Sequence, residues 1–207
     1  MKILIPTCKP VREIAAMVHA IGNAGGNCQI TPSCIEGASA SVNRNKCLDS
    51  LEVGEVAIML DDDIEGFYTS WIDDLTAPLV DSHVVAVSAR LLNSDGTFGP
   101  TCSRCYDDSP EEIEVRSNGQ CIIPTAAIAF RWRGHRFDCA FAGSGWEDND
   151  WFFQVLADDP QAKFIQSNRC KLIHRNEQKQ QHGSNWKHNQ AYFFTKWHGR
   201  RKAVANA

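Results

Sequence analysis

The sequence has no long hydrophobic run. Its apolar stretches fall well short of the roughly 18 residues that a membrane-spanning helix requires, and the apolar segment at residues 1–6 is too short for a secretory signal peptide. No repeat or low-complexity tract interrupts the 207 residues, of which 43% are hydrophobic. We therefore expect a soluble, cytoplasmic protein with one main domain and no membrane span.

A regular cysteine framework is also missing. The nine cysteines are odd in number and follow no regular spacing, which indicates reduced thiols rather than a set of disulfides. One close pair, Cys102 and Cys105, has the spacing of zinc ligands, but no second pair of this kind follows it. Cys121 and Cys139 could complete such a site, so structural zinc and free thiols both stay open here.

Acidic residues are almost absent from the C-terminal quarter. Residues 161–207 contain 10 Lys and Arg but a single acid, Glu177, whereas residues 1–160 contain 11 Lys and Arg against 24 Asp and Glu. This distribution predicts a basic C-terminal extension over residues 176–207 that packs on an acidic domain. Such an extension suits a phosphate-bearing partner, although a solubilising tail explains the charge equally well.

The order of predicted elements is that of a layered α/β domain. In the first half, hydrophobic periodicity predicts strands at 2–6, 27–31, 56–60 and 84–92, and helices at 11–21, 41–51 and 71–80. In the second half, we expect a loop or lid at 97–119, strands at 121–130, 163–166 and 170–174, and helices at 147–156 and 192–197. In a strand–helix–strand fold of this kind, ligands bind beyond the C-terminal ends of the strands.

Three consecutive acids, Asp61, Asp62 and Asp63, directly follow the predicted buried strand at 56–60. Adjacent carboxylates raise one another's pKa unless a cation lies among them. The triplet therefore indicates a divalent metal site at the end of this strand. The alternative is a solvated turn whose third acid caps the next helix.

Two later segments carry further candidates. Glu147 and Asp148 follow a glycine-rich loop at 143–145, where a carboxylate suits a general base. Because the helix dipole also favours acids in a first helical turn, the pair has a purely structural explanation as well. His174 ends the last predicted strand, and an imidazole together with carboxylates suits Mn²⁺ or Mg²⁺, which would neutralise a diphosphate.

Taken in order, five segments of the chain resemble the nucleotide-sugar glycosyltransferases of the GT-A fold, especially glycosyltransferase family 2. They are Ile-Pro-Thr, Asn-Arg-Asn, Leu-Asp-Asp-Asp, Gly-Trp-Glu-Asp-Asn-Asp and Ile-His, and they lie within residues 2–175. The resemblance implies a Rossmann-like three-layer α/β/α fold with a central mixed, mostly parallel sheet. It also implies a domain over residues 1–175, with its nucleotide-sugar half at 1–95 and its acceptor half at 96–175.

The resemblance implies a nucleotide site near the first strand. Thr7 would lie near the nucleotide, and Arg44 and Asn45 match the Arg-Asn pair of the family's helix beneath it. Many members carry an Asn-Arg pair in the loop after the first strand, which this chain lacks. Lys9, Arg12 or neither residue takes its place.

The resemblance also implies a metal site. Asp61 and Asp63 match the two acids of the family's Asp-any-Asp motif, Asp61 toward the ribose and the cation, and Asp63 as a direct metal ligand. Asp62 has the variable middle position beside the nucleotide, so the register is open by one residue. His174 matches the histidine that completes the metal shell in several members.

The implied reaction follows from these positions. Asp148 would be the catalytic base and Glu147 would hold the acceptor hydroxyl, while Trp146 either stacks on a sugar or belongs to the core. Metal and basic side chains would neutralise the leaving diphosphate, and one carboxylate would take the acceptor's proton. A single displacement of this kind inverts the anomeric carbon.

We therefore predict a metal-dependent, inverting, hexosyltransferase-like enzyme. Its donor would be a nucleoside-diphosphate sugar, with UDP as the favoured nucleotide, and its cofactor Mn²⁺ or Mg²⁺. One alternative is a metal-dependent nuclease or phosphotransferase, and another is a non-catalytic nucleotide-sugar-binding module. The acceptor stays open between a glycan and a modified nucleic acid bound by the basic extension.

Overall fold

The computed structural model describes residues 1–25, 29–34, 38–99, 113–115, 123–175 and 184–198. The strands are β1 (Lys2–Thr7), β2 (Gln29–Cys34), β3 (Val56–Leu60), β4 (Ile64–Glu65), β5 (Val84–Leu92), β6 (Ile113–Val115), β7 (Ala127–Arg131) and β8 (Lys163–His174). The α-helices are α1 (Ala15–Gly25), α2 (Ala40–Leu48), α3 (Trp71–Thr76), α4 (Glu147–Asp158) and α5 (Ser184–Trp197), with 3-10 turns η1 (Val11–Glu13) and η2 (Ala77–Val80).

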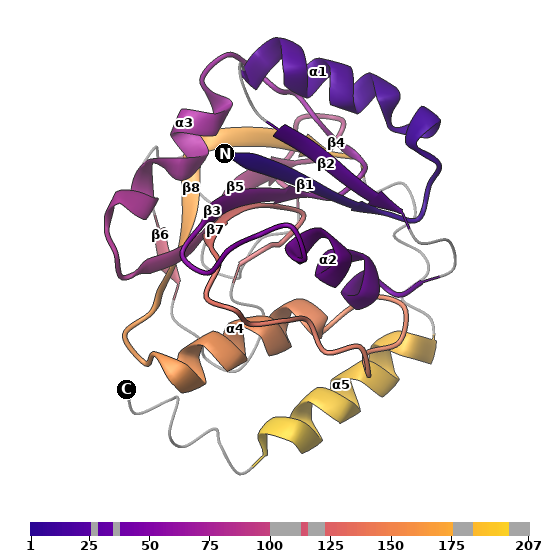
Figure 1. The fold of residues 1–207 in the computed structure, drawn as a ribbon, viewed down its shortest axis with the longest axis vertical. Coiled ribbons are helices and arrows are strands. Elements are labelled where there is room, and N and C mark those ends of the chain that lie inside the picture. The colour runs from indigo at the N-terminus through magenta and orange to yellow at the C-terminus, as the bar shows by residue number, and fades with distance from the viewer. Residues whose placement is uncertain (26–28, 35–37, 100–112, 116–122, 176–183, 199–207) are drawn as a thin grey trace.

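One mixed sheet forms the centre of the molecule (Figure 1). Its strand order is β2-β1-β3-β7-β5-β8-β4, and β6 pairs with β8 outside this path. The pairings give β1, β2, β3, β5 and β8 one common direction and β4, β6 and β7 the opposite one. The predicted α/β class with a mixed, mostly parallel sheet is confirmed.

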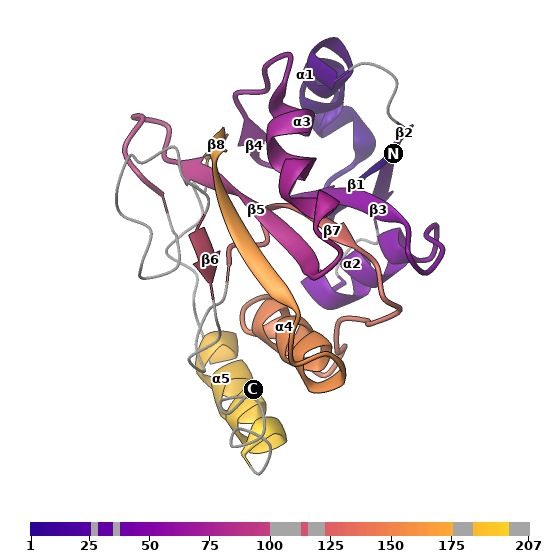
Figure 2. The same ribbon diagram turned by 90° about the vertical axis from the view of Figure 1, so that its left-hand side faces the viewer.

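Helices cover both faces of this sheet. Helices α1 and α3 lie on one side, and α2 and α4 lie on the other (Figures 1 and 2). The alternation of side chains in β3 shows why two layers are needed, because Ala57 and Met59 belong to the core beneath α2 and α4, whereas Ile58 and Leu60 belong to the core beneath α1 and α3. A strand that is apolar at every position must be covered on both faces.

Helix α5 extends the layer formed by α4 (Figure 1). Its Phe193 and Trp197 are buried, with ring centroids 5.0 and 5.4 Å from Phe153 of α4. Residues 176–183 and 199–207, which hold much of the predicted basic extension, lie outside the described residues. Among the residues that the structure describes, no helix has the length and apolar composition needed to cross a membrane.

Most predicted elements are present, with shifted ends. Strands β3 and β5 match the predicted ranges 56–60 and 84–92 residue for residue. The two strands predicted at 163–166 and 170–174 are one continuous strand, β8, because the polar residues between them stay in the sheet despite a register shift opposite Ala89 and Arg90. The predicted loop at 97–119 contains the short strand β6.

Candidate functional site

The acidic triplet and His174 meet through a short strand pairing. Chain residues after the triplet form β4, whose Ile64 pairs with His174 of β8 in antiparallel register. The backbone N–H of Arg175 also donates to the carbonyl oxygen of Asp63 at 3.1 Å. This pairing brings together two segments that are more than 100 residues apart in sequence, so the end of β8 lies beside the end of β3.

Asp61, Asp63 and His174 form the candidate metal centre. One possible ligand atom from each lies within 4.8 Å of the others, and Nε2 of His174 lies 3.1 Å from Oδ1 of Asp63. Burial alone would raise the pKa of Asp63, but the hydrogen bond and charge of His174 and the charge of Lys9 outweigh it and lower the pKa. Two carboxylates and an imidazole fit a divalent cation such as Mn²⁺.

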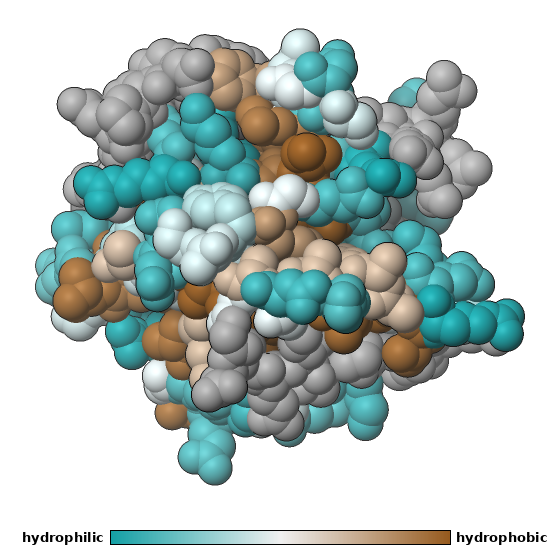
Figure 3. Space-filling model, turned by 90° about the horizontal axis from the view of Figure 1, so that it is seen from above, coloured by the Kyte–Doolittle hydropathy of each residue, from teal (hydrophilic) through white to brown (hydrophobic). Residues whose placement is uncertain are grey.

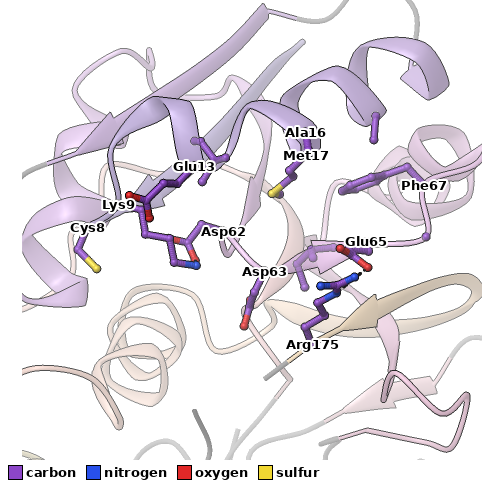
Figure 4. Close-up of a pocket in the computed structure, with 14 residues that line it drawn as sticks. Cys8, Lys9, Glu13, Ala16, Met17, Asp62, Asp63, Glu65, Phe67 and Arg175 are labelled. Atoms are coloured by element: carbon purple, nitrogen blue, oxygen red, sulfur yellow. Dashed lines mark hydrogen bonds and ion pairs between the residues drawn. The ribbon is translucent and has the colours of Figure 1, made fainter. Parts of the chain in front are cut away.

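Asp62 has different partners from its two neighbours. Its Oδ2 accepts a hydrogen bond from Oγ1 of Thr7, and its Oδ1 lies 2.7 Å from Nζ of Lys9. Figure 4 shows Asp62 turned toward Lys9 while Asp63 points another way. Asp62 therefore joins the triplet to the loop after β1, and it is not part of the converging set of Asp61, Asp63 and His174.

A buried arginine connects the metal centre to the second carboxylate pair. Arg44 lies on α2, whose first turn is capped by the side chain of Ser39, which accepts from the backbone N–H of Val42. Nη1 of Arg44 lies 2.7 Å from Oε1 of Glu147, and Nη2 of Arg44 lies 3.4 Å from Oδ1 of Asp61. Burial alone would lower the pKa of Arg44, but the two carboxylates raise it, so the guanidinium is held charged.

Glu147 and Asp148 begin α4 and have different surroundings. Glu147 is buried, and this burial raises its pKa to about 6 even though Arg44 acts to lower it. Asp148 is half-buried and accepts from Oγ1 of Thr125 at 3.4 Å and from the backbone N–H of Asn149 at 2.8 Å. The more accessible of the two carboxylates is therefore Asp148.

The structure does not bring Asn45 into this group. Its Nδ2 donates to the carbonyl oxygen of Phe137 at 2.8 Å, and its Oδ1 accepts from the N–H of the same residue at 2.9 Å. Both ends of the amide thus hold a backbone segment. Thr125 could not be found from the sequence, because a single threonine within an apolar segment carries no distinctive signal.

A cavity of about 840 Å³ adjoins the triplet. It lies between α1 and the segment after β3, and Met17 and Phe67 supply apolar walls. Lys9, Glu65 and Arg175 supply charge, with Nε of Arg175 2.8 Å from Oε2 of Glu65 (Figure 4). Viewed from the side of α1, the surface shows hydrophobic residues exposed among hydrophilic ones (Figure 3).

The predicted zinc site is not decided by this geometry. Cys102, Cys105 and Cys121 lie outside the described residues, and Cys139 is an exposed free thiol. Cys170 is a buried free thiol, and Cys47 is also buried. Free thiols at these described positions fit the expectation of reduced cysteines.

Comparisons with known proteins give a structural match without a sequence match. No protein-family model matches the chain, and no curated protein matches it in sequence. A crystal structure of GalNAc-T7 with UDP, GalNAc and Mn²⁺ matches with a TM-score of 0.57 at 14% identity, covering 93% of this chain and 41% of that one. No family model therefore supports the predicted membership of glycosyltransferase family 2. The structural likeness shows that this chain has the GT-A fold.

Proposed function

We propose that the protein is a metal-dependent glycosyltransferase that takes a nucleoside-diphosphate sugar as its donor. The observation that carries the proposal is the position of Arg44, which binds Glu147 with one nitrogen and Asp61 with the other. A cation site and a separate carboxylate pair therefore lie on either side of one guanidinium. In such an arrangement, a cation on one side would stabilise a leaving diphosphate, and a carboxylate on the other side would take the proton of an acceptor hydroxyl.

Asp61, Asp63 and His174 would hold Mn²⁺ or Mg²⁺ in this proposal. The ion supplies positive charge that stabilises a departing diphosphate. Thr7 and Lys9, both bound to Asp62, would fix the loop after β1 beside that diphosphate. The cavity next to Asp62 and Asp63 has the size of a small-molecule site, and the matching GalNAc-T7 structure holds UDP and Mn²⁺.

Asp148 is the proposed base. It is more accessible than Glu147, and its hydrogen bonds from Thr125 and from Asn149 fix its orientation. Glu147 keeps its predicted role of holding the acceptor hydroxyl, and its Oε2 has no hydrogen-bond partner among the described residues. A single base of this kind gives inversion at the anomeric carbon.

A screen of nucleoside-diphosphate sugars in the presence of Mn²⁺ tests the proposal. We expect at least one UDP-sugar to be hydrolysed slowly without acceptor, and the anomeric configuration of the fresh product, followed by NMR, to be inverted. Retention would contradict the single displacement. If no nucleotide sugar raises the melting temperature or is turned over, with or without metal, the proposal fails.

The acceptor is proposed as a glycan or a modified nucleic acid. For a polyanionic acceptor, transfer should weaken steeply as salt concentration rises and should weaken when residues 199–207 are removed. Transfer that is insensitive to both changes would exclude nucleic acid and leave a glycan. A nuclease or phosphotransferase would instead release nucleotides or move phosphate under the same conditions.

A further inference from the structure

We propose that Asn189 of α5 is a positioning residue for the loop that presents Glu147 and Asp148. The proposal rests on the proposed function, because it assigns that site a support outside the catalytic set. Asn189 is fully buried even though it is a polar residue of a helix with a polar sequence. A buried amide is stable only when its hydrogen bonds are made.

The hydrogen bonds of Asn189 all go to one segment. Its Nδ2 donates to the carbonyl oxygens of Ala142 and Gly145, each at 2.9 Å, and more weakly to that of Ser144 at 3.4 Å. Its Oδ1 accepts from the backbone N–H of Ala142 at 3.0 Å. A single side chain thus binds four backbone groups of the segment that precedes α4.

The segment needs such support because its backbone is unusual. Gly143, Gly145 and Trp146 have φ values of 61°, 101° and 73°, and a tryptophan rarely adopts the left-handed conformation. Residues in this conformation persist where the surrounding structure over-determines them. Trp146 caps α4 without any side-chain hydrogen bond, so the start of α4 is not fixed by a local cap.

Aromatic side chains of α5 also pack against the loop that precedes α4. The ring of Trp146 lies 5.2 Å from Phe193 and 5.6 Å from Trp186, measured between ring centroids. A Cβ atom added to Gly145 would lie 2.7 Å from the ring of Trp186. Since Glu147 directly follows Trp146, a shift of α5 must move the two carboxylates.

Helix α5 makes a second contact with α4, at Asp150. Nε1 of Trp197 donates to Oδ1 of the buried Asp150 at 2.8 Å, and Nζ of Lys196 lies 2.8 Å from the same atom. The polar and aromatic residues of α5 therefore fix both the loop and the first turn of α4. A misplacement of about 1 Å at a reacting group costs as much as 100-fold in rate.

The test uses the full chain and two variants that disturb the loop from opposite sides. Asn189→Ala removes the hydrogen bonds from α5 to the loop. Gly145→Ala adds a Cβ against the ring of Trp186 and leaves the amino-acid sequence of α5 unaltered. Thr195→Ala is the matched control, because its hydroxyl bonds only the carbonyl oxygen of Ala191 within α5 among the contacts described. Each protein is examined by hydrogen exchange over residues 142–149 and by the kinetics of Mn²⁺-dependent hydrolysis of the donor sugar.

For Asn189→Ala and Gly145→Ala, we expect exchange in residues 142–149 to rise by about tenfold or more. We expect kcat to fall by about 10- to 100-fold while KM for the donor changes by less than about threefold. Thr195→Ala should change none of these quantities. A residue that only stabilised the fold would not lower kcat in the folded enzyme at constant KM.

Unchanged exchange over 142–149, or unchanged kcat in a folded variant with raised exchange, would overturn the proposal. If Asn189→Ala does not fold, Asn189→Ser, which also loses the hydrogen bonds donated by Nδ2, takes its place under the same two criteria. If the unaltered protein turns over no nucleotide sugar, the proposed function fails by itself, and the exchange measurement still decides whether Asn189 holds the loop.

Discussion

Arg44 and Glu147 form a buried ion pair between α2 and α4, with Nη1 2.7 Å from Oε1. The two residues are 103 positions apart in sequence. Since Arg44 also reaches Asp61, this pair joins the candidate metal centre to the residue that directly precedes the candidate base Asp148. It is therefore a structural element of the site and a sensitive point for the stability of the fold.

Replacing Arg44 by Met should destabilise the protein strongly. Removal of one partner leaves Glu147 buried and unpaired, which costs about 3–5 kcal/mol of unfolding free energy. Urea denaturation measures this change. The matched control is Lys46→Met on the same helix, whose exposed pair with Asp49 at 3.8 Å should cost less than about 1 kcal/mol. Equal losses in the two variants would contradict the assignment.

Mn²⁺ binding should depend on Asp63 and His174 and not on Asp62. Asp63→Ala or His174→Ala removes a proposed ligand and should weaken the ion by more than about tenfold, or 1.4 kcal/mol. Asp62→Ala should change the affinity by only about threefold, because its oxygens are bound by Thr7 and Lys9. Titration monitored by Mn²⁺ EPR measures these affinities. If only Asp62→Ala lost Mn²⁺ binding, Asp62 would be the metal ligand in place of Asp63, and the register of the Asp-any-Asp motif would be shifted by one residue.

Asp148→Asn should separate binding from reaction. The variant keeps the shape of the side chain and the metal centre but lacks the proposed base, so donor affinity should stay constant while turnover falls by about 10²- to 10⁴-fold. Binding of the UDP-sugar and its rate of transfer or hydrolysis are measured on the same sample. If turnover persists at the original rate, Asp148 is not the base.

Acid should weaken the attachment of α5 through Asp138. Partial burial alone would raise the pKa of Asp138, but the hydrogen bonds from Lys196, the backbone N–H of Ala140 and Tyr192 lower it below 3.8. The unfolded chain therefore binds the proton first, so this contribution is present above the unfolded pKa and is lost as the pH falls through the lower folded pKa.

Because the Asp138 side chain is partly exposed, the contribution is modest, roughly 0.5–1 kcal/mol. The unfolding free energy of Asp138→Asn should accordingly fall less than that of the unaltered protein between about pH 5 and pH 2. Replacement of the exposed Asp73 by Asn is the control for the removal of one surface carboxylate. Parallel curves for the unaltered protein and Asp138→Asn would exclude the proposed contribution.

The regular parts of the fold could be predicted from local pattern. Strands β3 and β5 were predicted without error because β3 is an unbroken apolar run, β5 is apolar except at Ser88 and Arg90, and both lie between turn residues. Strand β8 was divided into two because buried polar residues such as Ser167 and Asn168 resemble a loop in sequence. Their burial in the sheet depends on neighbours that local pattern does not reveal.

The grouping of Asp61, Asp63 and His174 was predicted through the family resemblance, and the structure brings these three residues together. Local pattern alone could not predict it, because the approach of His174 depends on β4, a strand of two residues that gives no periodicity. Asn45 stays a predicted nucleotide contact, but both ends of its amide bind the backbone of Phe137. Asn189 carries no sequence signal either, since polar residues of an amphipathic helix normally face water.

The central claim is that the metal centre serves a nucleoside diphosphate. Calorimetric titration of UDP into the protein tests it most directly, with and without Mn²⁺, and with Asp63→Ala as the comparison. The account predicts binding that weakens more than about tenfold when Mn²⁺ is omitted and that is lost in Asp63→Ala. Equal affinity with and without the metal, or no binding of UDP or any other nucleoside diphosphate, would contradict it.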